Sequence, residues 1–99
     1  MDKYMIINVL RENKYTLKKQ FNILKVGLFG SYSSNSHNQN SDFDLVYELE
    51  EGEFLGLKEL YDLETFVKDI FKVERVDLVN QKYMNHIIEC EMNKTVIYV

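Results

Sequence analysis

Apolar residues recur along this 99-residue chain with two different periods, and these periods predict both helices and strands. Spacings of three, four and seven over residues 2–20 indicate one broken helix or two short ones, with the break in the segment RENKY at 11–15. The same spacing predicts a helix over 57–71, after a turn bracketed by two glycines. A last helix is expected at about 84–92.

Short runs rich in apolar, aromatic and β-branched residues predict the strands. The run KVGLF at 25–29 is almost continuously apolar and ends at a glycine, which is typical of a strand covered on both faces. DFDLVYE at 42–48 and RVDLV at 75–79 predict two more strands, and the apolar segment TVIYV at 95–99 ends the pattern. The chain shows no repeat, low-complexity tract or linker. We therefore expect one domain over 1–99 of class α+β, a small mixed sheet flanked by helices.

Composition narrows the classes of function. The 16 acidic and 12 basic residues give a net charge of −4, which argues against binding to DNA or RNA and against a nucleic-acid template. Cys90 is the single cysteine, so no intramolecular disulfide can form and a zinc site would need three ligands of other kinds. No apolar run approaches the roughly 20 residues that span a bilayer, and Arg11 and Glu12 come too early for a signal peptide. The expectation is a cytoplasmic protein with no membrane partner.

Three aspartates stand on the predicted strands. Residues two apart in a strand point to the same face, so Asp42 and Asp44 present their carboxylates together, while Phe43 and Leu45 face the other way. Asp77 lies within an apolar strand, and if that strand is adjacent, the three carboxylates converge. Their repulsion would raise their pKa values unless a cation neutralises them. Hard oxygen ligands of this kind suit Mg²⁺ or Mn²⁺, the metals of phosphoryl and nucleotidyl transfer.

Gly30 and Ser31 follow the first predicted strand and suit the same chemistry. A strand that ends in glycine and turns into a serine-capped helix offers backbone N–H groups and a hydroxyl to phosphate oxygens. The absence of a side chain at Gly30 lets a ligand approach closely. A phosphate site would then adjoin the metal site.

The order of these residues resembles a known pattern. Gly30-Ser31, ten residues and then Asp42-x-Asp44 is similar to the signature of the DNA polymerase β-like nucleotidyltransferase superfamily. LFGSY, SDFDLV and VDLV together resemble its smallest branch, the minimal nucleotidyltransferases (MNT). The similarity extends over nearly the whole chain, to the closing segment NHIIECEMNKTVIYV. It implies the nucleotidyltransferase fold.

The resemblance also implies an activity and a role for five residues. Asp42 and Asp44 would bind two magnesium ions, for which Mn²⁺ can substitute, and Asp77 would ligate one ion and accept the proton of the attacking hydroxyl. Gly30 and Ser31 would hold the phosphates of ATP. Members of this branch typically pair with a small helical HEPN ribonuclease toxin, and some neutralise it by transferring AMP to a toxin tyrosine. The resemblance thus implies a magnesium-dependent adenylyltransferase that acts as an antitoxin.

One departure from the family pattern leaves alternatives open. Ser34 and Asn35 stand where relatives commonly have arginine and glycine, so a phosphate or structural contact is lost. Lys25, Arg75 or a partner's residue could replace that cation. The alternatives are an antitoxin of weak catalysis that occludes its toxin, and transfer to a small molecule such as an aminoglycoside.

Three other features carry weaker hypotheses. His86 and Cys90 are four residues apart on a predicted helix, but no second pair completes a metal site, and we interpret them as ordinary helix residues. The acidic segment ELEEGE at 48–53 could guide a basic partner. The segment at 95–99 could pair with a second chain to form a homo-oligomer.

Overall fold

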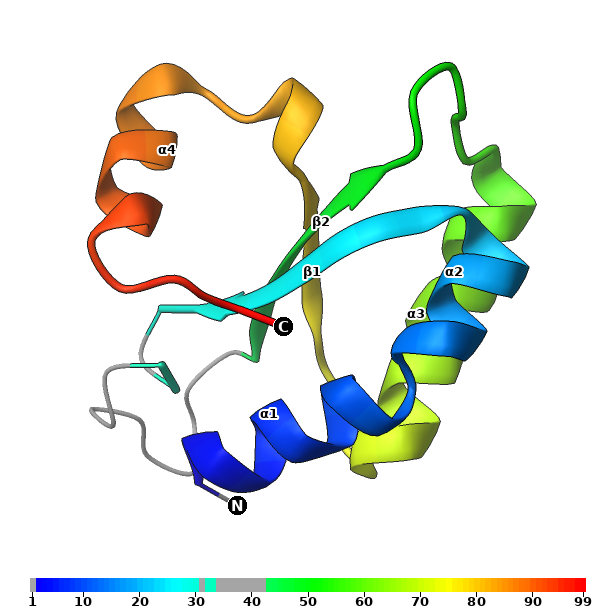
Figure 1. The fold of residues 1–99 in the computed structure, drawn as a ribbon, viewed down its shortest axis with the longest axis horizontal. Helices are drawn as coiled ribbons and strands as arrows, with labels where there is room; N and C mark the ends of the chain where they lie inside the picture. Colours follow the sequence, from blue (N-terminus) through cyan, green and yellow to red (C-terminus); the bar gives the residue numbers. More distant parts are fainter. Residues whose placement is uncertain (1, 31, 34–42) are drawn as a thin grey trace.

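Four α-helices, one short 3₁₀ helix and four strands make up the part of the chain that this computed structural model describes, residues 2–30, 32–33 and 43–99. The strands form one sheet in the order β3-β2-β1-β4 (Figure 1). In chain order the elements are α1 (Lys3–Glu12), α2 (Lys14–Phe21), β1 (Ile23–Phe29), β2 (Asp44–Leu49), α3 (Leu57–Phe71), β3 (Asp77–Asn80), η1 (Gln81–Tyr83), α4 (His86–Asn93) and β4 (Ile97–Tyr98).

The sheet is mixed, as the sequence predicts. β1 runs antiparallel to β2 and to β4, whereas β2 and β3 are parallel. A parallel pair needs a crossover connection, and α3 supplies it between β2 and β3. The expected α+β class, a small mixed sheet flanked by helices, is confirmed.

The N-terminal helical segment breaks where the pattern predicted. α1 begins after Asp2, whose carboxylate accepts a hydrogen bond from the Met5 N–H at 3.0 Å, and it ends at Glu12. Asn13 then occupies the junction, where its side-chain Nδ2 donates to the Val9 carbonyl at 2.8 Å. Asparagine competes with the helix for such carbonyls, so the chain changes direction and α2 starts at Lys14.

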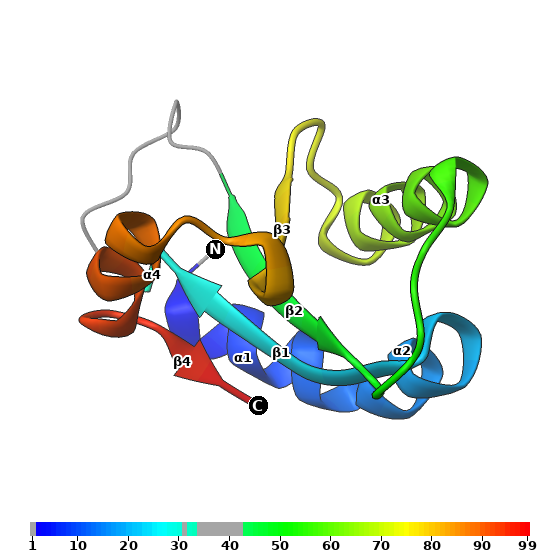
Figure 2. The same ribbon diagram turned by 90° about the horizontal axis from the view of Figure 1, so that it is seen from above.

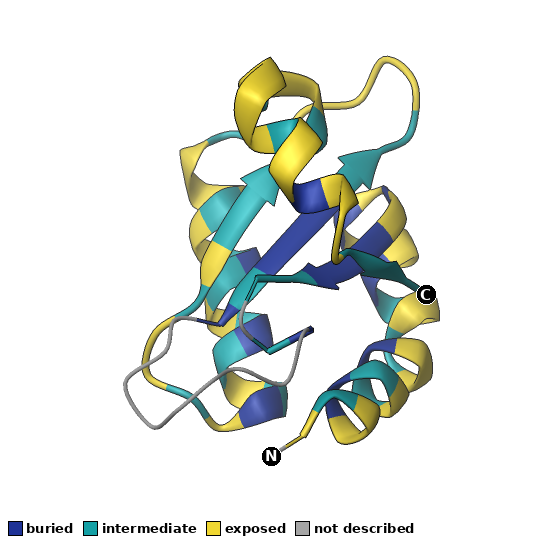
Figure 3. Ribbon diagram, turned by 90° about the vertical axis from the view of Figure 1, so that its left-hand side faces the viewer, coloured by how far each residue is buried: buried dark blue, intermediate teal, exposed yellow. Residues whose placement is uncertain are grey.

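One face of the sheet carries the hydrophobic core. Helices α1, α2 and α3 lie against this face, and α4 lies on the other side of the sheet (Figures 1 and 2). Buried residues concentrate in the central strands and in the inward stripes of the helices (Figure 3). The core cluster consists of Ile6, Leu10, Leu17, Phe21, Ile23, Val26, Leu28, Phe43, Leu45, Tyr47, Leu63, Val67 and Phe71.

Element boundaries differ from the expected ones where local features interrupt the periodicity. β1 starts at Ile23, two residues early, because the register with β2 shifts between Ile23 and Lys25 and the alternation is lost there. β3 starts at Asp77, two residues late. The short helix η1 was not predicted, and it depends on Asn80, whose side chain accepts from the Lys82 N–H at 3.0 Å.

The last helix and the last strand are shorter than the sequence predicts. Asn85 caps α4 by accepting a hydrogen bond from the Ile87 N–H at 2.8 Å, so that helix starts two residues later than expected. Only Ile97 and Tyr98 of the apolar segment at 95–99 form β4. None of the helices in the described ranges is long and apolar enough to cross a membrane.

Candidate active site

Asp44 and Asp77 stand side by side at one end of the sheet. They are register partners in the parallel pair of β2 and β3, and each is the first residue of its strand. The Asp77 N–H donates to the carbonyl of Phe43 at 2.8 Å, which fixes this register. Register partners on adjacent strands lie about 4.8 Å apart and point to the same face. The adjacency of the two strands, on which the expected convergence of the carboxylates depends, is therefore confirmed.

Core packing sets the face that Asp44 occupies. Phe43 and Leu45 on either side of it are 2% and 0% exposed and belong to the core cluster. Since successive side chains of a strand alternate, Asp44 must point to the face away from the core, where it is half-buried. Asp77 has the same relation to Val76 and Leu78, which pack against the core, and it is exposed.

Gly30 lies directly against the Asp44 carboxylate. β1 ends at Phe29, the register partner of Asp44, and Gly30 follows with a φ of +78°. A Cβ atom at Gly30 would stand 2.5 Å from the Asp44 Oδ2 atom, too close for any real side chain. Glycine is thus required here both by the left-handed backbone and by the neighbouring carboxylate.

Ser33, a residue for which the sequence predicts no role, holds the turn that follows Gly30. Its Oγ donates to the Gly30 carbonyl at 2.8 Å, and its side chain is 4% exposed, the one buried polar residue in the described ranges. The neighbouring Tyr32 ring packs edge-on against Phe43, with centroids 5.4 Å apart. A serine three residues after a strand-ending glycine is a turn signal that could have indicated this contact.

Two of the five predicted site residues, Ser31 and Asp42, lie outside the described residues. Within residues 2–30, 32–33 and 43–99, no group of three or more histidine, cysteine, aspartate or glutamate side chains could hold a metal ion. The third carboxylate of the expected site therefore stays a prediction. The donors that are described, two adjacent carboxylates with a glycine against one of them, fit a hard divalent cation such as Mg²⁺.

The two cations that could replace the missing arginine have different surroundings. Lys25 is the register partner of Glu48, far along β1 from Phe29, and its Nζ lies 4.4 Å from the centroid of the Tyr98 ring. Arg75 lies two residues before Asp77, is exposed, and forms no ion pair with any residue of the described ranges. Arg75 is therefore the candidate closer to the carboxylates.

His86 and Cys90 do come together on α4. The His86 Nε2 and Cys90 Sγ atoms are 3.9 Å apart, and both residues are exposed. In the part of the chain that the structure describes, no further ligand joins them in a metal site. Two ligands are too few for a structural zinc ion.

Comparison with known proteins identifies the family to which this fold belongs. The nucleotidyltransferase domain model matches residues 10–98. Protein adenylyltransferase MntA of Thermococcus cleftensis is 29% identical over 94 residues, which cover 95% of this chain and 92% of that protein.

Two solved structures share the fold. A minimal nucleotidyltransferase superposes with a TM-score of 0.75 at 25% identity and covers 98% of this chain and 95% of that chain. A complex of tri-AMPylated Shewanella oneidensis HEPN toxin with MNT antitoxin contains a chain that superposes with a TM-score of 0.58 at 20% identity, covering 96% of this chain and 66% of that chain. With the family model matched over most of its length, the chain belongs to the nucleotidyltransferase domain family.

Proposed function

We propose that this protein is a cytoplasmic adenylyltransferase that transfers AMP from ATP to a tyrosine hydroxyl of a HEPN-type partner, as the antitoxin of a toxin–antitoxin pair. Family membership and a relative named a protein adenylyltransferase support the reaction class and the protein acceptor. The complex with a tri-AMPylated HEPN toxin supports the kind of acceptor. The observation that carries the proposal is the pairing of Asp44 with Asp77 beside Gly30.

The residues at this end of the sheet would hold the metal and the nucleotide. Asp44 and Asp77, together with Asp42, would ligate two Mg²⁺ ions, which when bound neutralise the triphosphate and the developing charge on its oxygens. Gly30, which lacks a side chain, would let the phosphates approach its backbone, and Ser31 would contact them. Ser33 keeps the Gly30 carbonyl fixed, so the turn is already shaped for the ligand.

The reaction is a displacement at the α-phosphorus of ATP. The acceptor oxygen forms a bond to the α-phosphorus, the bond from that phosphorus to the bridging oxygen breaks, and pyrophosphate leaves with the bond's electrons. Asp77, which is exposed, would take the acceptor's hydroxyl proton. Positioning and charge neutralisation account for most of the rate in such transfers.

Labelled ATP tests the proposal directly. The chain is incubated with α-³²P-ATP, MgCl₂ and the HEPN protein encoded beside its gene, and label on a tyrosine of that protein is the expected result. A stable complex without label would indicate occlusion, the alternative that Ser34 and Asn35 leave open. Label on an added aminoglycoside, with none on the protein, would indicate a small-molecule acceptor.

Arg75 is expected to act as a phosphate-binding cation of this site. Arg75 lies two residues before Asp77, is exposed, and is separated from it by Val76, which packs against the core. Arg75→Ala should raise the KM for ATP about 10-fold, because a charge-assisted hydrogen bond to phosphate is lost. Steady-state kinetics with varied ATP measure this.

Lys25→Ala is the matched control for that measurement. Lys25 is exposed like Arg75, but it contacts the Tyr98 ring and pairs in register with Glu48, at the far end of β1. Its removal should change the KM for ATP less than about 2-fold, since exposed charges far from a ligand are screened. Equal KM values for the two variants would contradict the assignment of Arg75.

A further inference from the structure

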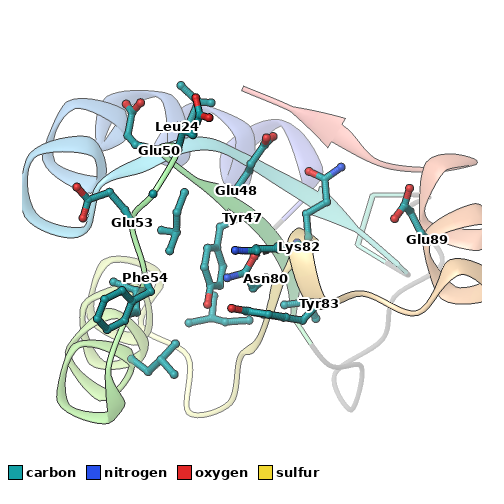
Figure 4. A pocket seen from close by; sticks show the side chains of 18 residues that line it. Leu24, Tyr47, Glu48, Glu50, Glu53, Phe54, Asn80, Lys82, Tyr83 and Glu89 are labelled. Atoms are coloured by element: carbon teal, nitrogen blue, oxygen red, sulfur yellow. Dashed lines mark hydrogen bonds between the residues drawn. The ribbon is translucent and has the colours of Figure 1, made fainter.

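A broad groove runs from β3 to the end of β2 that lies opposite to Asp44. It has a volume of about 1200 Å³, and its walls come from the last residues of β2, the connection from β2 to α3, and η1 (Figure 4). Its nearest lining residues are Leu78, which follows Asp77 on β3, and Tyr47, about 10 Å along β2 from Asp44. The connection from β2 to α3 begins beyond Leu49, about 17 Å from Asp44. The groove therefore begins beside Asp77 and extends to residues that the site proposed for ATP does not use.

Large apolar side chains stand exposed at this groove. Phe54, in the connection from β2 to α3, is 78% exposed, and Tyr83 of η1 is 74% exposed. On the adjoining helix α3, Leu60 lines the groove, while Leu57 and Tyr61 are 89% and 69% exposed outside the lining. An apolar surface of this kind, concave and rimmed by polar groups, is typical of a site for another protein.

The floor of the groove is polar at one point and already ordered. Tyr47 is 4% exposed and is the register partner of Asn80 in the β2–β3 pair. Burial raises the pKa of the Tyr47 hydroxyl above its ordinary value, so this hydroxyl stays protonated at neutral pH. The Lys82 Nζ atom lies 5.7 Å from the centroid of the Tyr83 ring, so this ring already makes a cation–π contact.

The charge around the groove is strongly negative. Two acidic side chains there have neighbours: Glu50 lies 3.9 Å from Lys18 Nζ, and Glu53 accepts from Asn22 Nδ2 at 3.3 Å. Glu51 is exposed and pairs with no cation in the described ranges. Lys82 is the one basic residue in the lining, and the acidic ones are Glu48, Glu50, Glu51, Glu53 and Glu89.

We propose that this groove docks a basic segment of the HEPN partner, one that places an apolar side chain between Phe54 and Tyr83 and lysine or arginine on the glutamate rim. Charge complementarity selects this occupant, since an acidic or neutral segment would leave the excess of five acidic side chains over one lysine in the lining unbalanced. The proposal rests on the proposed function for the identity of the partner. Docking between Phe54 and Tyr83 raises the effective concentration of the acceptor tyrosine near Asp44 and Asp77.

Binding of the purified HEPN protein encoded beside this chain's gene tests the proposal by calorimetry. Phe54→Ala combined with Glu51→Lys should weaken the complex at least about 10-fold, because an aromatic anchor and a rim charge are both removed. Tyr15→Ala combined with Glu74→Lys is the matched control, an exposed tyrosine on α2 and an exposed glutamate before β3, and should weaken it less than about 2-fold. The wild-type complex should also weaken as salt rises from 50 to 300 mM.

The outcomes separate this inference from the proposed function. A groove variant that binds as tightly as the wild type would overturn the docking site, while labelling of the partner would still support AMP transfer. If the wild-type chain forms no complex with the HEPN protein, both fail together. The shift in Tm caused by ATP with MnCl₂ should be the same in the groove variant and in the wild type. A lost shift would show that the variant is misfolded. In that case Tyr83→Ala replaces Phe54→Ala in the binding comparison.

Discussion

Asp44→Asn should reduce AMP transfer by about 10³-fold or more while the protein stays folded. Asp44 is half-buried at the start of β2, with Asp77 as its register partner and Gly30 against its carboxylate, so its charge lies at the centre of the candidate site. An asparagine fills the same space but carries no negative charge to hold a divalent cation. Transfer of label from α-³²P-ATP to the partner measures the loss.

A second readout of the same variant does not depend on catalysis. Addition of MnCl₂ to the wild-type chain should raise its Tm, because an ion that binds the folded state stabilises it. The shift should disappear in Asp44→Asn, whereas Asp69→Asn, an exposed carboxylate on α3, should keep both the shift and the activity. Labelling by Asp44→Asn at the wild-type rate, or an unchanged Mn²⁺ shift, would remove Asp44 from the metal site.

The position of Asp44 could be predicted from the sequence because it depends on local alternation. Phe43 and Leu45 are large and apolar, so the strand has one way to bury them, and the aspartate must take the other face. The helix α3 could be predicted for a similar reason, since Leu63, Val67 and Phe71 recur at spacings of four and end up buried. In both cases a short stretch of sequence repeats one apolar spacing, so each residue in it supports the same prediction.

Features that join distant segments could not be predicted in the same way. The register of Asp44 with Asp77 depends on how α3 returns the chain to the sheet. From the sequence, the two carboxylates could be expected to converge only if their strands were adjacent. The groove needs residues 47–55 and 78–83 side by side, and neither segment alone indicates a concave surface. Ser33 is buried and the adjacent Tyr32 packs on Phe43, a contact between separate segments that no local pattern contains.

Gly30→Ala should abolish most of the activity and also destabilise the fold. Alanine at a φ of +78° costs about 1–2 kcal/mol, and its Cβ would meet the Asp44 Oδ2 atom at 2.5 Å, which adds about 1–3 kcal/mol of overlap or displaces the carboxylate. A shift of about 1 Å in a catalytic group can reduce the rate about 100-fold. Urea denaturation measures the free energy of unfolding, and single-turnover labelling measures the rate.

Gly52→Ala separates the two effects of that substitution. Gly52 has a φ of +82°, so alanine there carries the same backbone strain, but nothing lies within 4 Å of its added Cβ. It should therefore lose about 1–2 kcal/mol of stability and keep wild-type activity. Of these two glycines, only Gly30 has a carboxylate beside it. The difference in rate between the two variants therefore measures the effect of the contact with Asp44. Equal rates would mean that the close approach of Gly30 to Asp44 serves only the turn and not the transfer of AMP.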